Sequence, residues 1–168
     1  MKNGSIVGGA SNYTIQNNGT ATFEDVTATA GNVGSSMLDN FGTLTINSGN
    51  YSGGLNVVKS EEGSTLLITG GTFTLGDVPD NGYTAVILVY GDTTITGGRF
   101  VQGNDAPKKW AYPQVVATGV VDGYTAITRV SGGTFINRAT ASGCKIFHGL
   151  GKATSDNFEV SGGTFNKS

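Results

Sequence analysis

Short apolar and polar runs alternate along this 168-residue chain and return in nearly the same order. The run Ile68-Thr-Gly-Gly-Thr-Phe73 recurs at 95–100, 130–135 and 160–165, with a looser copy at 46–51. The aromatic residues that end successive copies lie 22, 27, 35 and 30 residues apart. A repeat of this length predicts a solenoid, in which each unit buries its apolar face against its neighbours.

The side-chain period within one copy predicts how it folds. Leu66 and Ile68 share one face of a strand, whereas Phe73 has the opposite parity. The side chains of Ile68 and Phe73 can both point inward only if the Gly-Gly pair between them forms a corner, which glycine permits. Stacking then predicts an aliphatic ladder and an aromatic ladder inside the solenoid, with these members: Ile46, Ile68, Ile95, Val130 and Val160; Tyr51, Phe73, Phe100, Phe135 and Phe165.

A second apolar run precedes each Gly-Gly strand. These runs lie at 55–58, 85–89, 115–116 together with 120–121, and 145–147. Each coil is therefore predicted to contain an apolar strand, a polar turn and a Gly-Gly strand. Counting the strand around Phe23 as the first, the sequence predicts an all-β, parallel β-solenoid of about six coils, forming a single domain over residues 1–168.

Composition excludes several classes of function. Ten basic and 12 acidic residues give a net charge of −2, so nucleic acid is not an expected partner. Cys144 is the only cysteine, which excludes an internal disulfide. The chain lacks a long apolar run, so membrane insertion is not expected. Residues 1–5 lack the apolar core of a signal peptide, which favours synthesis without ordinary secretion or loss of a leader.

The [Ile/Val]-[Thr/Ser]-Gly-Gly-x-Phe repeat resembles that of right-handed parallel β-helix proteins, including bacterial surface proteins, phage tail and fibre proteins, and pectate-lyase-like enzymes. The resemblance implies a right-handed parallel β-helix on a virion or cell surface. Enzymes of that family are usually longer and carry an N-terminal capping helix, whereas no amphipathic helix precedes Ile6 and the chain stops shortly after Phe165. We therefore expect a homo-oligomer, such as a trimer, or attachment to a larger assembly.

The longer intervals between copies predict loop insertions at 74–83, 101–113 and 136–142. All three follow the same strand of a coil, so they should project from one edge of the solenoid. Aromatic rings beside carboxylates, amides and lysines suit sugar binding, because a pyranose has an apolar face and a rim of hydroxyl groups. The alternative is that Trp110 folds back over the solenoid. The candidate ligand-binding residues are Asp80, Tyr83, Asn104, Asp105, Lys108, Lys109, Trp110 and Tyr112.

Acidic and amide residues also recur in the turns before the Gly-Gly strands. Stacking would align them in a column that could bind Ca²⁺ or supply a carboxylate pair for a glycosidase. Asp-Gly and Asn-Gly are, however, common turn sequences, which is the stronger interpretation. Arg99 and Arg129 are predicted to point outward, where most arginines pair with a neighbour or face solvent. No catalytic set, metal site or cofactor is predicted.

The sequence thus favours a non-enzymatic structural or recognition module of a phage particle or bacterial surface. It would bind a glycan or protein partner through loops on one edge. One alternative is a carbohydrate-active enzyme, a lyase or hydrolase, that uses Glu62, Asp92, Asp122 or Asp105. Another is an intracellular protein-binding inhibitor module, whose size would suit a stand-alone chain.

Overall fold

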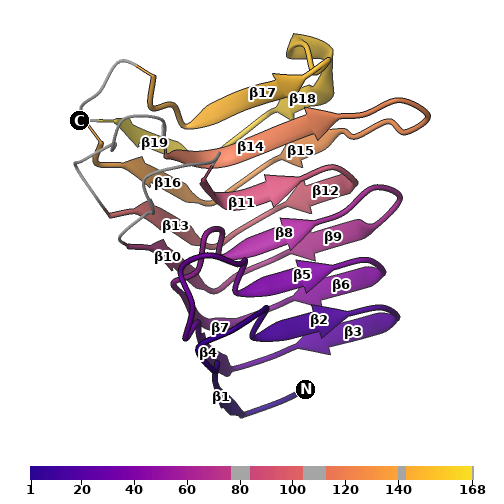
Figure 1. The fold of residues 1–168 in the computed structure, drawn as a ribbon. Coiled ribbons are helices and arrows are strands. Elements are labelled where there is room, and N and C mark those ends of the chain that lie inside the picture. The colour runs from indigo at the N-terminus through magenta and orange to yellow at the C-terminus, as the bar shows by residue number, and fades with distance from the viewer. Residues whose placement is uncertain (77–83, 104–112, 140–142, 168) are drawn as a thin grey trace.

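The chain winds into a right-handed parallel β-helix in which each complete coil contributes one strand to each of three sheets (Figure 1). The computed structural model describes residues 1–76, 84–103, 113–139 and 143–167. All strand pairs in the three sheets are parallel and join one coil to the next. The predicted fold class and the count of about six coils are confirmed.

We call the three sheets I, II and III in the order in which the chain passes through them. Sheet I contains β1 (Ser5–Val7), β4 (Val26–Thr29), β7 (Gly49–Ser52), β10 (Thr72–Leu75), β13 (Arg99–Gln102), β16 (Thr134–Asn137) and β19 (Thr164–Lys167). Sheet II contains β2 (Ile15–Asn17), β5 (Leu38–Asn40), β8 (Val58–Ser60), β11 (Ala85–Val89), β14 (Gln114–Val120) and β17 (Phe147–Gly151). Sheet III contains β3 (Thr20–Phe23), β6 (Thr43–Ile46), β9 (Thr65–Ile68), β12 (Asp92–Ile95), β15 (Thr128–Val130) and β18 (Phe158–Val160).

Both predicted internal ladders are present. In sheet III, Ile46 pairs with Ile68, which pairs with Ile95, and the row continues to Val130 and Val160. In sheet I, the aromatic rings stack with centroids 4.8 to 5.4 Å apart. As far as Val130 and Phe135 these rings and aliphatic side chains bury one another in one continuous core, whereas Val160 and Phe165 on the last described rungs are 45% and 42% exposed.

Each Gly-Gly pair forms the corner between sheets III and I, and its two glycines are needed for different reasons. A Cβ on Gly97 would overlap the carbonyl oxygen of Thr69 in the preceding coil. Gly98 has φ +105°, a conformation that other residues rarely adopt. The first glycine therefore allows close stacking of coils, and the second turns the chain so that Phe100 points inward.

At the turns between sheets II and III, asparagine side chains rather than carboxylates point into the interior of the β-helix. Asn17 and Asn40 are buried, and the Asn17 Nδ2 donates to Asn40 Oδ1 at 2.8 Å. The Asn40 Nδ2 in turn donates to Ser60 Oγ at 3.0 Å. Because these side chains also bond the turn backbone, they satisfy polar groups that the corner would otherwise bury unpaired.

The strands of sheet I extend two residues into each predicted loop. Thr74 and Leu75 belong to β10, Val101 and Gln102 to β13, and Ile136 and Asn137 to β16, because each pairs with the neighbouring coil. The only described helix is the 3₁₀ turn η1 (Ser155–Asn157). Within the described residues, no helix has the length and apolar character needed to cross a membrane.

Candidate functional site

The loop residues predicted to bind a ligand lie outside the described residues. These are Asp80, Tyr83, Asn104, Asp105, Lys108, Lys109, Trp110 and Tyr112. Their segments connect sheet I to sheet II in the fourth and fifth pairs of strands, β10 to β11 and β13 to β14. The equivalent connections of the earlier coils, 8–14, 30–37 and 53–57, are described, and they border a groove.

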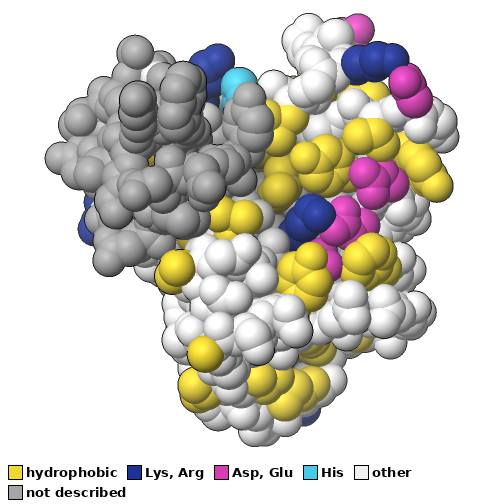
Figure 2. Space-filling view, in the orientation of Figure 1, with side chains coloured by type: hydrophobic (Ala, Val, Ile, Leu, Met, Phe, Trp, Pro, Cys, Tyr) yellow, Lys and Arg dark blue, Asp and Glu magenta, His cyan; other side chains and the backbone are white. Residues whose placement is uncertain are grey.

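The groove lies on the outer face of sheet II. Strand register brings one outward-facing residue from each of five coils into a row, consisting of Asp39, Lys59, Leu88, Ala117 and His148. Polar residues occupy the N-terminal half of this row, and an apolar cluster of Ala85, Leu88, Ala117 and Leu150 occupies the next coils. Figure 2 shows this combination as basic and acidic side chains beside hydrophobic ones on a single face.

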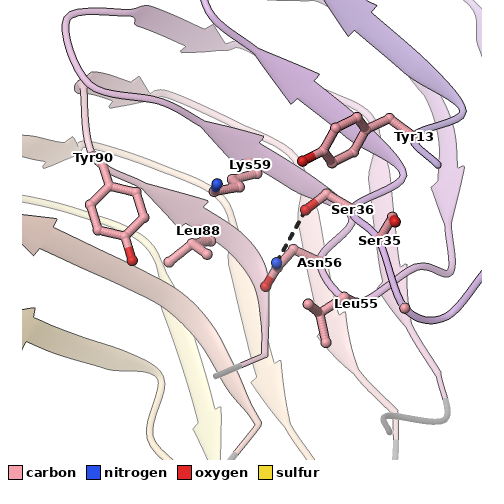
Figure 3. A pocket seen from close by; sticks show the side chains of 9 residues that line it. Tyr13, Ser35, Ser36, Leu55, Asn56, Lys59, Leu88 and Tyr90 are labelled. Atoms are coloured by element: carbon pink, nitrogen blue, oxygen red, sulfur yellow. Dashed lines mark hydrogen bonds between the residues drawn. The ribbon is translucent and has the colours of Figure 1, made fainter. Parts of the chain in front are cut away.

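A cavity of about 300 Å³ opens in the polar half of the groove (Figure 3). Tyr13 and Tyr90 stand on opposite sides of it, with Lys59 between them. The short connections also supply Ser35, Ser36, Leu55 and Asn56. Asn56 is held in place because its Nδ2 donates to Ser36 Oγ at 3.2 Å and its Oδ1 accepts from the Ala85 N–H at 2.8 Å. The cavity therefore combines two aromatic rings with a rigid polar wall.

Three charged side chains lie together beside this cavity. The Lys59 ammonium pairs with Glu61 and lies 5.9 Å from the centroid of the Tyr90 ring. Asp39 is fully buried, and its carboxylate oxygens make no hydrogen bond of regular geometry to the described residues, although the side chains of Glu61 and Tyr13 lie close enough to affect its pKa. Burial raises the pKa of Asp39 to about 6, with Glu61 adding to the rise and Lys59 and Tyr13 opposing it. Two carboxylates thus share one ammonium group.

The pKa of Lys59 reflects the same arrangement. Burial lowers this pKa, but the hydrogen bond and charge of Glu61 and the charge of Asp39 outweigh burial, so the pKa is raised overall. Lys59 is therefore a fixed cation whose charge is largely satisfied within the protein.

A second cavity, of about 370 Å³, lies further along the groove and shares Tyr90 with the first. Val120, Val121, Leu150 and Gly151 complete its lining. The Tyr90 ring lies over the next coil at Gly119, where a Cβ would overlap the ring. Glycine in the middle of β14 thus makes the space in which the ring lies, and the ring separates the two cavities.

Two of the other carboxylates considered from the sequence are engaged elsewhere. Asp92 accepts a hydrogen bond from the Ile127 N–H at 3.1 Å, and the exposed Asp122 pairs with Lys152. Glu62 lies in the turn between β8 and β9. Within the described part of the chain, no group of three or more His, Cys, Asp or Glu residues is placed to hold a metal ion. Arg129 pairs with Glu159 at 3.1 Å on the exposed surface, as expected for an outward arginine.

The groove residues were missed by the sequence reasoning, which followed the longest intervals between repeats. Tyr13, Lys59 and Tyr90 instead come from the short connections and from sheet II itself. One available signal was the outward parity of Lys59 and Leu88 in an otherwise apolar strand region, which marks a row on the outer side of sheet II.

Comparisons of the chain with protein-family models, with curated proteins and with solved structures find no match. The fold class is therefore defined by the strand pairing alone, as a right-handed parallel β-helix. Function is inferred from the groove on its outer face.

Proposed function

We propose that this protein is a non-enzymatic recognition module that binds a glycan in the groove on the outer face of sheet II. The observation that carries the proposal is the first cavity, in which Tyr13 and Tyr90 flank Lys59. Tyrosine rings can stack on the apolar face of a sugar ring, and the adjacent serine and lysine side chains can bond its hydroxyl groups.

The rigidity of the site favours binding. The groove floor belongs to a parallel sheet, and Asn56 is hydrogen-bonded to Ser36 in the preceding connection and to Ala85 at the start of β11. A preformed site loses little conformational freedom when a ligand binds, so more of the contact energy contributes to affinity. The three loop insertions enter sheet II at the edge where this cavity lies, and we propose that they add to the same recognition surface.

The biological setting is proposed from the resemblance of the repeat. A β-helix of this kind would serve as part of a phage particle or a bacterial surface structure, either as a homo-oligomer or within a larger assembly. The alternative of a carbohydrate-active enzyme has less support, since Asp92 and Asp122 bond a backbone amide and a lysine.

A panel of bacterial polysaccharides tests the proposal. We expect the protein to bind at least one member, and we expect Tyr90→Ala to weaken that binding about tenfold, because a lost aromatic contact of roughly 1.4 kcal/mol corresponds to that factor. Tyr124→Ala is the matched control, since Tyr124 is half exposed but lines neither cavity.

Failure to bind any polysaccharide, or equal binding by the Tyr90 and Tyr124 variants, would contradict a glycan site in this groove. Polysaccharide cleavage that is lost in Asp122→Asn would instead support the enzyme. Binding of a protein partner that depends on Tyr90, without glycan binding, would support the protein-recognition alternative.

A further inference from the structure

We infer that the ligand is a linear, non-acidic saccharide chain that crosses the Tyr90 ring and places units in both cavities. This inference rests on the proposed function and specifies the class of glycan. It depends on three features of the groove: the shared ring, the direction of the row, and the balance of charge.

The shared ring makes the two cavities parts of one site. Tyr90 follows β11 and lines both cavities. Its ring occupies the space left by Gly119 in the next coil, so it lies along the groove instead of standing away from the sheet. A ring held in this way offers a platform on which a sugar unit can stack while the units before and after it enter the two cavities.

The groove runs along the axis of the solenoid. Its row of outward residues advances by one coil at each step from Asp39 to His148, and parallel strands are spaced about 4.8 Å apart. One sugar unit is of similar length to this step. The two cavities follow one another in this direction, so an unbranched chain that passes from the first to the second would meet successive coils with successive units, whereas a branched or compact glycan would contact fewer of them.

The charges of the groove disfavour an acidic chain. Lys59 is the only cation among the described lining residues, and it is paired with Glu61 and attracted by Asp39. A ligand carboxylate would have to compete with both protein carboxylates for that ammonium group. The lining residues of the second cavity are uncharged. Neutral or amino sugars avoid this competition.

Three oligomer series test the inference by calorimetry at low salt. Glucose, glucosamine and galacturonic acid oligomers are compared, each from the monosaccharide to the hexasaccharide. We expect the neutral or the amino series to bind with an affinity that rises at least tenfold between the monosaccharide and the longer oligomers. We expect galacturonic acid oligomers of equal length to bind at least tenfold more weakly.

Two variants assign these effects to the residues named. Gly119→Ala should displace the Tyr90 ring and abolish the rise in affinity with oligomer length. Tyr90→Phe should keep that rise, because the ring is preserved. Glu61→Gln should reduce the difference in affinity between neutral and acidic oligomers several-fold, because it frees Lys59 to pair with a ligand carboxylate. Circular dichroism of each variant checks that the β-helix is folded.

Failure of this inference can be distinguished from failure of the proposed function. If a saccharide binds in a Tyr90-dependent manner but the monosaccharide binds as tightly as the hexasaccharide, or galacturonic acid oligomers bind best, the inference is wrong and the proposed function stands. Unchanged length dependence in a folded Gly119→Ala protein would also overturn it. If none of the three series binds, the inference is wrong, and the bacterial polysaccharide panel then decides whether the proposed function also fails.

Discussion

Asp39 is a buried carboxylate whose position lowers the stability of the folded protein. It has no exposed surface and its carboxylate oxygens make no hydrogen bond of regular geometry to the described residues, while Lys59 supplies a favourable charge and Glu61 an unfavourable one. Its pKa is raised to about 6 from the ordinary 3.8. A raised pKa means that the folded protein binds the proton more tightly than the unfolded chain. Ionised Asp39 therefore destabilises the fold near neutral pH.

Asp39→Asn should consequently stabilise the protein at pH 7, by about 1 to 3 kcal/mol. The parent should gain stability from this group as the pH falls through about 6, since the folded protein is protonated first. Below about pH 4 the carboxyl is protonated in both states, and the difference between the two proteins should disappear. Urea unfolding at several pH values measures this.

Asp122→Asn is the control for this experiment. Asp122 is exposed and pairs with Lys152 at the surface, and exposed pairs of this kind contribute less than about 1 kcal/mol. Asp122→Asn should change the free energy of unfolding little, both at pH 7 and below about pH 4. If the effect of Asp39→Asn does not depend on pH, or if the variant is less stable than the parent at pH 7, then ionised Asp39 does not destabilise the folded protein and the prediction is wrong.

At the scale of the element, the Gly-Gly corner determines how closely coils can stack. Gly70, Gly97, Gly132 and Gly162 share one position, at which a Cβ would overlap a backbone oxygen of the preceding coil. Backbone cannot move aside as a flexible side chain can. The close approach therefore requires glycine, independently of the positive φ at the next residue.

Gly97→Ala should accordingly destabilise the protein by about 2 to 3 kcal/mol, as expected for overpacking. Gly19→Ala is the matched control, because a Cβ there meets no atom within 4 Å, and it should change stability by less than about 0.5 kcal/mol. Thermal and urea unfolding compare the two. Equal effects would mean that the coils separate easily at the corner.

The repeat allowed the corner and both ladders to be predicted, whereas the groove could not be. Ile68 and Phe73 lie in one short segment, so their parity and the intervening glycines contain the needed information. Asp39, Lys59, Tyr90 and Gly119 come from four coils. Their proximity depends on the exact register of sheet II and on the direction of one tyrosine ring, neither of which a repeat in sheets III and I specifies.

At the scale of the whole molecule, stability is distributed along a one-dimensional stack. Each coil contacts mainly the coils before and after it, so a residue's contribution depends on its position in the column. Phe100 is fully buried between Phe73 and Phe135, with rings 5.0 and 4.8 Å away. Phe165, at the last rung described, is 42% exposed.

Phe100→Ala should therefore cost about 3 to 5 kcal/mol, which includes the cavity left between two rings. Phe165→Ala should cost about 1 kcal/mol, because its ring is only partly buried. Urea unfolding with a comparison of midpoints measures both in the 168-residue chain. Equal losses, or a Phe100→Ala protein that unfolds at the parent's temperature, would contradict an internal ring column.

The chain runs from sheet I to sheet II through connections of very different length, yet strands on either side stay in register. Residues 53–57 connect β7 to β8, and residues 103–113 connect β13 to β14, while Phe73 still pairs with Phe100 and Lys59 with Leu88. Insertions at this edge leave the core undisturbed. Residues can therefore be added to or removed from the connections at this edge of the solenoid while the strand pairing of the core is kept.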